Sequence, residues 1–185
     1  MLSSSMKQFK YYKQLADKAM SQLSDPDMYF HQQNPEDNSI ALIMQHMAGN
    51  MKSRWSNIFT EDGEKPWRNR DAEFESGNND TSELMEKWQE GWAILFDTIQ
   101  TLKDTDLDKT IFIRNEGLLV SDAIIRQLCH YSYHCGQIVS KCKQLKGGAW
   151  ESLSIPRNQS KDYNLKKFSE ERQTKHFLDE LLDKE

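Results

Sequence analysis

The chain has no long hydrophobic run and no apolar N-terminus, and each absence excludes a class of protein. None of its 185 residues belongs to an apolar stretch approaching the ~18 residues that a bilayer-spanning helix needs. The first residues, MLSSSMKQFKYYKQ, become charged and aromatic where a secretory signal would be apolar. We therefore expect a cytoplasmic protein with no membrane partner.

Cysteine is scarce, and basic residues show no excess. The three cysteines, Cys129, Cys135 and Cys142, fall in one segment at near-helical spacing, which is not the pattern of a disulfide framework. We expect them to be reduced and buried as small hydrophobic side chains. The formal net charge is -5 and the two signs are interspersed, whereas a nucleic-acid interface needs clustered Lys and Arg. No nucleic-acid partner is expected.

Long tracts of glycine, proline or serine are also absent, so no linker divides the chain. The length fits one domain over residues 1–185. Within it we expect a helical core at residues 3–146 and a C-terminal extension at residues 147–185.

Hydrophobic residues recur every three or four positions in four segments, which is the pattern of amphipathic helices. The first stripe covers residues 6–23 and stops before Pro26. The second covers residues 40–58, with Asn34 or Asn38 as the candidate N-cap. Both segments predict long helices.

The third stripe covers residues 84–102 and follows Asp80, a candidate N-cap. The fourth helix is predicted to begin at Ser121 and to end at the glycines of positions 147–148. Four such helices without a repeated strand pattern indicate an all-α fold, a four-helix bundle.

The connections between these helices differ in length. Residues 60–80 form a link of about twenty residues, well beyond the roughly two to eight usual between bundle helices, so we expect this long loop to cross the bundle end or cover a site. Residues 109–120 are β-prone and form either a small hairpin or an extended link. The extension is expected to be a strap followed by a short docked helix around residues 177–182.

Two histidines, His130 and His134, lie on one face of the fourth helix. They occupy a polar stripe beside the apolar stripe that buries the helix, and their spacing of four residues points both imidazoles the same way. His46 flanks the apolar stripe of the second helix. Neutral imidazole is a common ligand of first-row metals, so the three histidines are candidate metal ligands.

Other site classes find less support. The stretch HYSYH lacks the glutamate of the HExxH motif of metalloproteases, and no GxSxG motif or phosphate-binding glycine loop occurs. The alternative, that His130 and His134 are an ordinary surface or hydrogen-bonded pair, stays open. His31 and His176 are expected to be solvated.

The residues QHMAGN around His46 and HYSYHCGQI from His130 resemble the DinB-like superfamily, also called YfiT-like, of metal-dependent proteins. The most specific part is HxxxHxGQ, formed by His130, His134, Gly136 and Gln137. The likeness spans roughly residues 3–146, and the stretches SRW, DGEKPWRNRDAEFE and SIPRNQS are similar to a bacterial DinB-like branch.

This resemblance implies an up-up-down-down bundle, a homodimer, and a divalent metal, zinc or nickel, on His46, His130 and His134. Three imidazoles leave a coordination position open, as in catalytic zinc sites. Relatives include thiol S-transferases that use low-molecular-weight thiols and a maleylpyruvate isomerase. The resemblance thus implies a metal-dependent enzyme acting on a small-molecule substrate, such as a thiol S-transferase. A metal-dependent hydrolase and a non-catalytic metal-binding stress-response protein are the alternatives.

Three residues on the helices are pocket candidates. Gln137 lies one turn past His134 and either orients that imidazole or bonds a loop. Asn50 and Arg54 extend the face of His46 and line the pocket mouth, unless Arg54 is simply solvated.

The long loop adds an aromatic side chain, Trp67, and two guanidinium groups, Arg68 and Arg70. These would suit a carboxylate on a thiol or its acceptor. Alternatively, the two arginines pair with Asp71 and Glu73.

Overall fold

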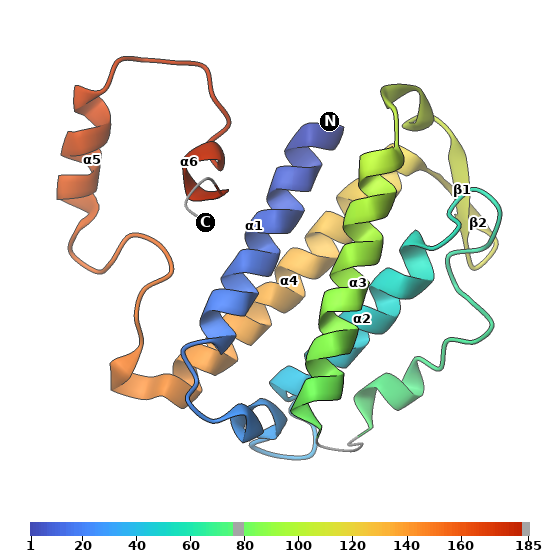
Figure 1. Cartoon of the computed structure of the whole chain (residues 1–185), viewed down its shortest axis with the longest axis horizontal. Helices are drawn as coiled ribbons and strands as arrows, with labels where there is room; N and C mark the ends of the chain where they lie inside the picture. The colour runs from blue at the N-terminus through green and yellow to red at the C-terminus, as the bar shows by residue number, and fades with distance from the viewer. Residues whose placement is uncertain (76–79, 183–185) are drawn as a thin grey trace.

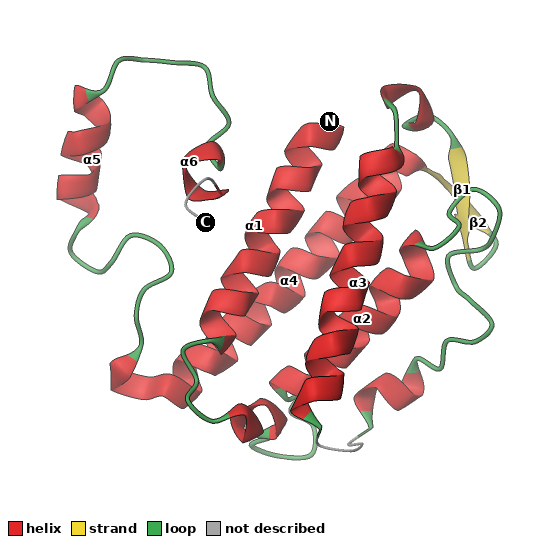
Figure 2. Ribbon diagram, viewed as in Figure 1, coloured by secondary structure: helices red, strands yellow, loops and turns green. Residues whose placement is uncertain are grey.

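The computed structural model describes residues 1–75 and 80–182, so residues 76–79 of the predicted long loop and 183–185 of the extension lie outside this description. Four long helices lie side by side (Figure 1): α1 (Leu2–Met20), α2 (Ile40–Trp55), α3 (Thr81–Thr101) and α4 (Val120–Lys146). The largest side chains of their shared core are Phe9, Trp55, Trp88, Trp92 and Tyr131. The regular secondary structure of the described part is helical apart from one hairpin, as Figure 2 shows, which confirms the all-α prediction. None of its helices is both long and apolar enough to cross a bilayer.

Helix α1 runs parallel to α4. The ring centroid of Phe9 lies 6.0 Å from that of Tyr131, and at the C-terminal ends of both helices the Lys146 ammonium donates to the carbonyl of Gln22. The connection over residues 21–39, which includes the 3-10 helix η1 (Pro26–Phe30), stays at that end of the molecule (Figure 1). Helix α2 therefore runs back in the opposite direction.

Helices α2 and α3 are also parallel to each other. Ala48 faces Gly91, and farther along the Thr98 hydroxyl donates to the carbonyl of Trp55 at 2.8 Å. The chain must return along the helices between α2 and α3, so the helix directions follow an up-down-down-up order. The predicted up-up-down-down order is wrong, because the long connection joins α2 to α3 whereas α1 and α2 are joined at one end.

Helix α2 begins at a different cap from the predicted one. The Ser39 hydroxyl accepts a hydrogen bond from the backbone N–H of Leu42 at 3.2 Å. Asn34 instead accepts from the N–H of Glu36, within a turn that precedes the helix. The prediction of Asn34 or Asn38 as the cap is therefore wrong, since the side chain of Asn34 is used locally.

The remaining helix boundaries lie close to the predicted ones. Asp80 caps α3 as expected, because its carboxylate accepts from two backbone N–H groups of the first turn. Helix α4 begins at Val120, one residue earlier than predicted. Helix α2 ends at Trp55, so Ile58 follows the helix, although it is still buried.

Residues 109–120 form the hairpin alternative, with β1 (Thr110–Ile113) antiparallel to β2 (Glu116–Leu119). Arg114 and Asn115 form its turn with positive φ angles of 57° and 61°. The Asp62 carboxylate accepts from both of their backbone N–H groups at 2.8 Å. The hairpin is thereby attached to the segment that follows α2.

The described residues 147–182 of the C-terminal extension contain two α-helices, of which one was predicted. Helix α6 (Asp179–Leu182) is the expected short helix, and it docks on α1, where Asp179 pairs with Lys7; Leu178, just before the helix, is buried. His176 precedes this helix and its ring bonds the Ser4 hydroxyl at 3.1 Å. Helix α5 (Ser160–Ser169) has no buried residue, so its sequence carries no core-facing stripe that could have predicted it.

The cysteines are free, as expected, but they are not all buried. Cys135 and Cys142 lie on the apolar face of α4, and burial raises the pKa of both thiols, that of Cys142 to about 12. Cys129 is exposed, which corrects the prediction for that residue, because it lies off the stripe of Cys135 and Cys142.

The close approach of α2 and α3 predicts a stability difference between two glycine substitutions. A Cβ on Gly91 would lie 3.0 Å from the Cα of Ala48, whereas one on Gly136 would meet nothing within 4 Å. Gly91→Ala should lower the free energy of unfolding by about 1–3 kcal/mol, because the helices must separate. Gly136→Ala should raise it by up to about 1 kcal/mol through helix propensity. Urea denaturation of both variants measures this, and equal stabilities would contradict the close-packing argument.

Candidate metal centre

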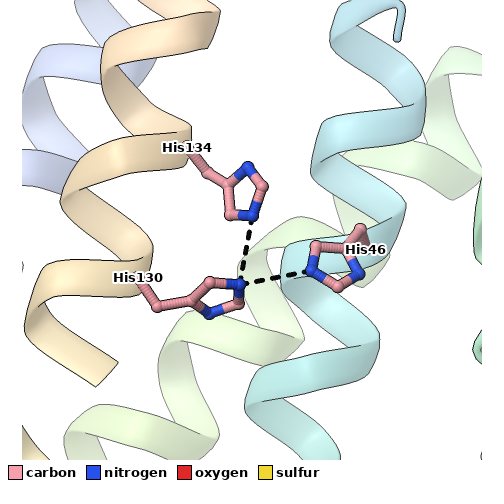
Figure 3. A group of neighbouring side chains, drawn as sticks. All are labelled: His46, His130 and His134. Atoms are coloured by element: carbon pink, nitrogen blue, oxygen red, sulfur yellow. Dashed lines mark hydrogen bonds between the residues drawn. The ribbon is translucent and has the colours of Figure 1, made fainter. Parts of the chain in front are cut away.

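The three predicted histidines meet between α2 and α4 (Figure 3). The Nε2 atom of His130 lies 3.3 Å from Nε2 of His46 and 3.1 Å from Nε2 of His134. Potential ligand atoms of all three lie within 4.8 Å of one another. Among the described residues, no fourth His, Cys, Asp or Glu joins this group. The group can hold a metal ion.

Helix geometry explains how the three side chains meet. His130 and His134 are separated by one turn of α4 and so project in the same direction. His46 lies on the face of α2 that is turned toward them and is only 5 % exposed, whereas the two α4 histidines are half-buried. The site is therefore closed on the α2 side and reaches the surface on the α4 side.

Two of the imidazoles have a hydrogen-bond partner on the ring nitrogen that faces away from the group. Nδ1 of His46 lies 2.9 Å from the Glu73 carboxylate, and Nδ1 of His134 lies 2.7 Å from the amide oxygen of Gln137. Because both partners accept, each Nδ1 carries the proton and each Nε2 keeps its lone pair. The expectation that Gln137 orients His134 matches this contact.

The donor set fits a cation better than it fits a hydrogen-bonded cluster. Only His130 is free to place a proton on Nε2, and one proton cannot bond the lone pairs of both His46 and His134. In addition, two atoms bound at 2.0–2.1 Å to one tetrahedral ion are about 3.3–3.4 Å apart, close to the observed contacts. Nitrogen lone pairs that have no proton to bond, at the spacing of ligands around one ion, are characteristic of a metal-binding site.

Burial keeps the α4 imidazoles neutral. The buried surroundings lower the pKa of His130 to about 3, and the neighbouring His134 and His46 add to this effect. Burial also lowers the pKa of His134, although the bond with Gln137 opposes the shift. Both rings are therefore available as ligands at neutral pH.

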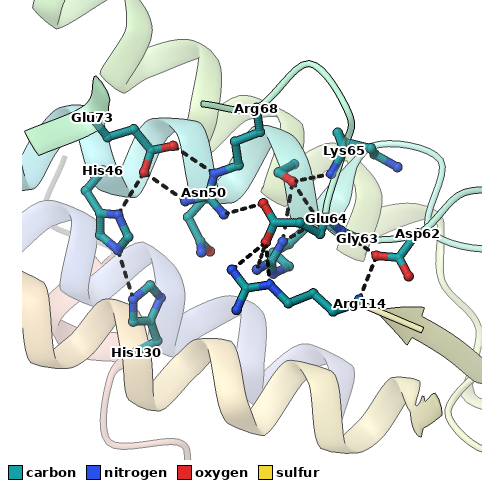
Figure 4. Close-up of polar contacts among 12 residues, drawn as sticks. His46, Asn50, Asp62, Gly63, Glu64, Lys65, Arg68, Glu73, Arg114 and His130 are labelled. Atoms are coloured by element: carbon teal, nitrogen blue, oxygen red, sulfur yellow. Dashed lines mark hydrogen bonds and ion pairs between the residues drawn. The ribbon is translucent and has the colours of Figure 1, made fainter. Parts of the chain in front are cut away.

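Glu73 is part of the site and was not predicted to contact a histidine. It belongs to the 3-10 helix η2 (Asp71–Phe74) within residues 56–75, which we call the crossover segment (Figure 4). Arg68 holds its carboxylate with two bonds, from Nε to Oε1 at 2.7 Å and from Nη2 to Oε2 at 2.8 Å. Burial raises the pKa of Glu73, but the bonds with His46 and Arg68 outweigh it and hold the pKa below its usual range. Glu73 is thus a carboxylate.

The predicted pocket residues on α2 take part in buried hydrogen bonds. Asn50 is buried, and its side-chain oxygen accepts from the Tyr131 hydroxyl at 2.9 Å. Arg54 is only 7 % exposed; it donates to the carbonyl of Gly63 and to Glu64. The alternative of a solvated Arg54 is therefore wrong, because the crossover segment covers it.

Of the three candidate side chains in the long loop, Arg68 forms an ion pair, whereas Trp67 and Arg70 are exposed. Arg68 forms an ion pair with Glu73, which agrees with the alternative that the loop arginines pair with neighbouring acidic residues. Its guanidinium is therefore engaged by Glu73. Arg70 is exposed and lies over the Phe74 ring at 5.4 Å, and Trp67 is 55 % exposed. Phe74 in turn packs on the His46 ring with centroids 4.9 Å apart, a contact that no sequence pattern signalled.

The lowered pKa of His130 predicts how stability depends on pH in chelator-treated protein. The unfolded chain takes up a proton on this residue below pH ~6.5, whereas the folded chain does so only near pH 3. The free energy of unfolding should therefore fall as pH drops from 6.5 toward 3, and His130→Gln should reduce this slope. Denaturation at several pH values in EDTA measures it, with His31→Gln at an exposed position as the control. An unchanged slope in His130→Gln would contradict the assignment.

Comparisons with known proteins assign a family but no activity. No curated protein and no solved structure matches the chain. One family model matches residues 1–159, which include all four long helices, the three histidines and Glu73. The chain therefore belongs to the family described as Protein of unknown function (DUF1572).

Proposed function

We propose that the protein binds one divalent cation, zinc or nickel, through His46, His130 and His134, as a member of the DinB-like superfamily. The observation that carries this proposal is the convergence of three Nε2 atoms at 3.1–3.3 Å contacts, with lone pairs that no proton can satisfy together. The hydrogen bonds of Glu73 and Gln137 support it, because such partners commonly fix the tautomer of metal-binding histidines.

We further propose that this site acts on a small molecule. Three protein ligands leave one position of a tetrahedral ion open, and His130 and His134 are partly exposed on the side that a substrate group would approach. A divalent cation at such a site lowers the pKa of a bound thiol or water, which is the chemistry of thiol transfer and of hydrolysis. The HxxxHxGQ resemblance favours a low-molecular-weight thiol as the first substrate to test, and hydrolysis is the alternative.

The protein's own residues then have separate tasks. Glu73 and Gln137 hold the Nδ1 protons of His46 and His134, so that both Nε2 atoms face the site. Phe74 covers one face of the His46 ring and keeps water from it. The exposed side chains of Trp67 and Arg70 on the crossover segment are the proposed contacts for an anionic acceptor.

Metal analysis tests the proposal directly. Protein purified without chelator, or reconstituted at neutral pH, should carry close to one divalent ion per chain. His130→Ala and His134→Ala should lose the ion while circular dichroism stays helical, because the apolar stripe of α4 lies on a neighbouring face. His176→Ala, outside the site, should keep it. Absence of stoichiometric metal in the reconstituted protein would rule out the proposal, and loss of helicity together with metal would make the ion structural.

A panel of substrates tests the reaction class. With small thiols and monochlorobimane as the electrophilic acceptor, the metal-loaded protein should accelerate conjugation, because a free thiol of pKa ~8.5 is mostly protonated at neutral pH. His46→Ala should abolish the acceleration. Turnover of esters or amides without a thiol would favour hydrolysis instead, and no turnover in either panel by the fully loaded protein would contradict both reactions.

A further inference from the structure

Glu73 reaches the histidine group from a part of the chain that few hydrogen bonds attach to the helices. The crossover segment begins firmly anchored: the Gly63 N–H bonds the carbonyl of Phe112 at 2.8 Å, and Glu64 bonds Arg54 of α2 at 2.9 Å. Within the described residues 66–75, η2 packs on α2, and the hydrogen bond and the ring contact that this stretch makes with α2 are those of Glu73 and Phe74 with His46. The remaining bonds there are local to the segment, such as Arg68 with Glu73.

We propose that Glu73 is a positioning residue that links metal binding at His46 to the ordering of residues 66–75. This inference rests on the proposed metal site. His46 would then have two functions, with Nε2 as a ligand and Nδ1–H as the anchor for η2 (Figure 4). Gln137 differs, since it belongs to the same helix as its partner His134 and can transmit nothing to another segment.

The shape of α2 is adapted to this contact. A Cβ on Gly49 would lie 2.3 Å from Oε1 of Glu73 and 3.0 Å from its Cδ. Helix α2 cannot move away from Glu73, because Ala48 already packs on Gly91 of α3. An alanine at position 49 would therefore have to displace the Glu73 carboxylate from its place beside His46.

Electrostatics indicates that metal binding strengthens the hydrogen bond between Glu73 and His46. When Nε2 of His46 donates its lone pair to a cation, the Nδ1–H becomes more acidic and bonds the carboxylate more strongly. The Glu73–His46 contact is therefore stronger in the metal-bound protein than in the metal-free protein. The coupling is reciprocal: the free energy by which the bound ion strengthens the Glu73–His46 contact equals the free energy by which that contact strengthens metal binding.

Metal titrations provide the first test. Glu73→Gln keeps the size of the side chain but removes its charge, and Gly49→Ala displaces it; each should weaken Zn²⁺ binding 10–100-fold, the range typical of such outer partners. Glu73→Gln should also shift the visible absorption spectrum of the Co²⁺-loaded protein, which a merely structural role would not do. Glu75→Gln, on the same segment, and Gly136→Ala, also within a helix, are matched controls that should bind like the wild type.

Hydrogen exchange provides the second test and uses the wild-type chain. Zn²⁺ should slow exchange in residues 66–75, and this protection should be absent from Glu73→Gln at saturating Zn²⁺, with hairpin residues 110–119 as the internal reference. If the wild type binds Zn²⁺ but residues 66–75 exchange equally with and without it, the linkage is wrong and the metal site stands. Wild-type affinity in both Glu73→Gln and Gly49→Ala would also overturn the linkage. If the wild type binds no metal, the proposed function itself fails.

Discussion

A buried chain of hydrogen bonds between α2 and α4 sets the geometry on which the site depends. The Trp55 indole donates to the Tyr131 hydroxyl at 3.2 Å, and that hydroxyl donates to Asn50 at 2.9 Å. Tyr131 is fully buried, so breaking the chain would leave unpaired polar groups in the core, at a cost of roughly 1–3 kcal/mol each. Asn50 lies one turn from His46, and Tyr131 adjoins His130. The same contacts that fix the helices therefore bring the imidazoles together.

His134 and His46 are oriented by hydrogen-bond partners that differ in charge. His134 relies on a neutral amide of its own helix, whereas His46 relies on a carboxylate supplied by the crossover segment and held by Arg68. A charged partner strengthens the donor power of an imidazole more than an amide does. The connection between α2 and α3 thus contributes a side chain to the histidine group.

Predictions based on local spacing succeeded where the cause is local. The four helices, the Asp80 cap and the shared direction of His130 and His134 all follow from backbone periodicity and short-range hydrogen bonds. The predictions were wrong where a different local hydrogen-bond partner, or a contact with a distant part of the chain, determines the environment of a side chain. Asn34 forms a turn with Glu36, and Arg54 is buried by residues of the crossover segment.

The sequence by itself determined the helical class, the position of each long helix and the three candidate ligands, because side-chain spacing along a helix dictates which residues share a face. Only the tertiary structure decided that α1 and α2 run in opposite directions, that Glu73 bonds His46 and that Gly49 makes room for it. Glu73 and His46 are connected by a long irregular segment whose path depends on every helix it passes. No periodic pattern encodes such a contact, since it results from the packing of the whole chain.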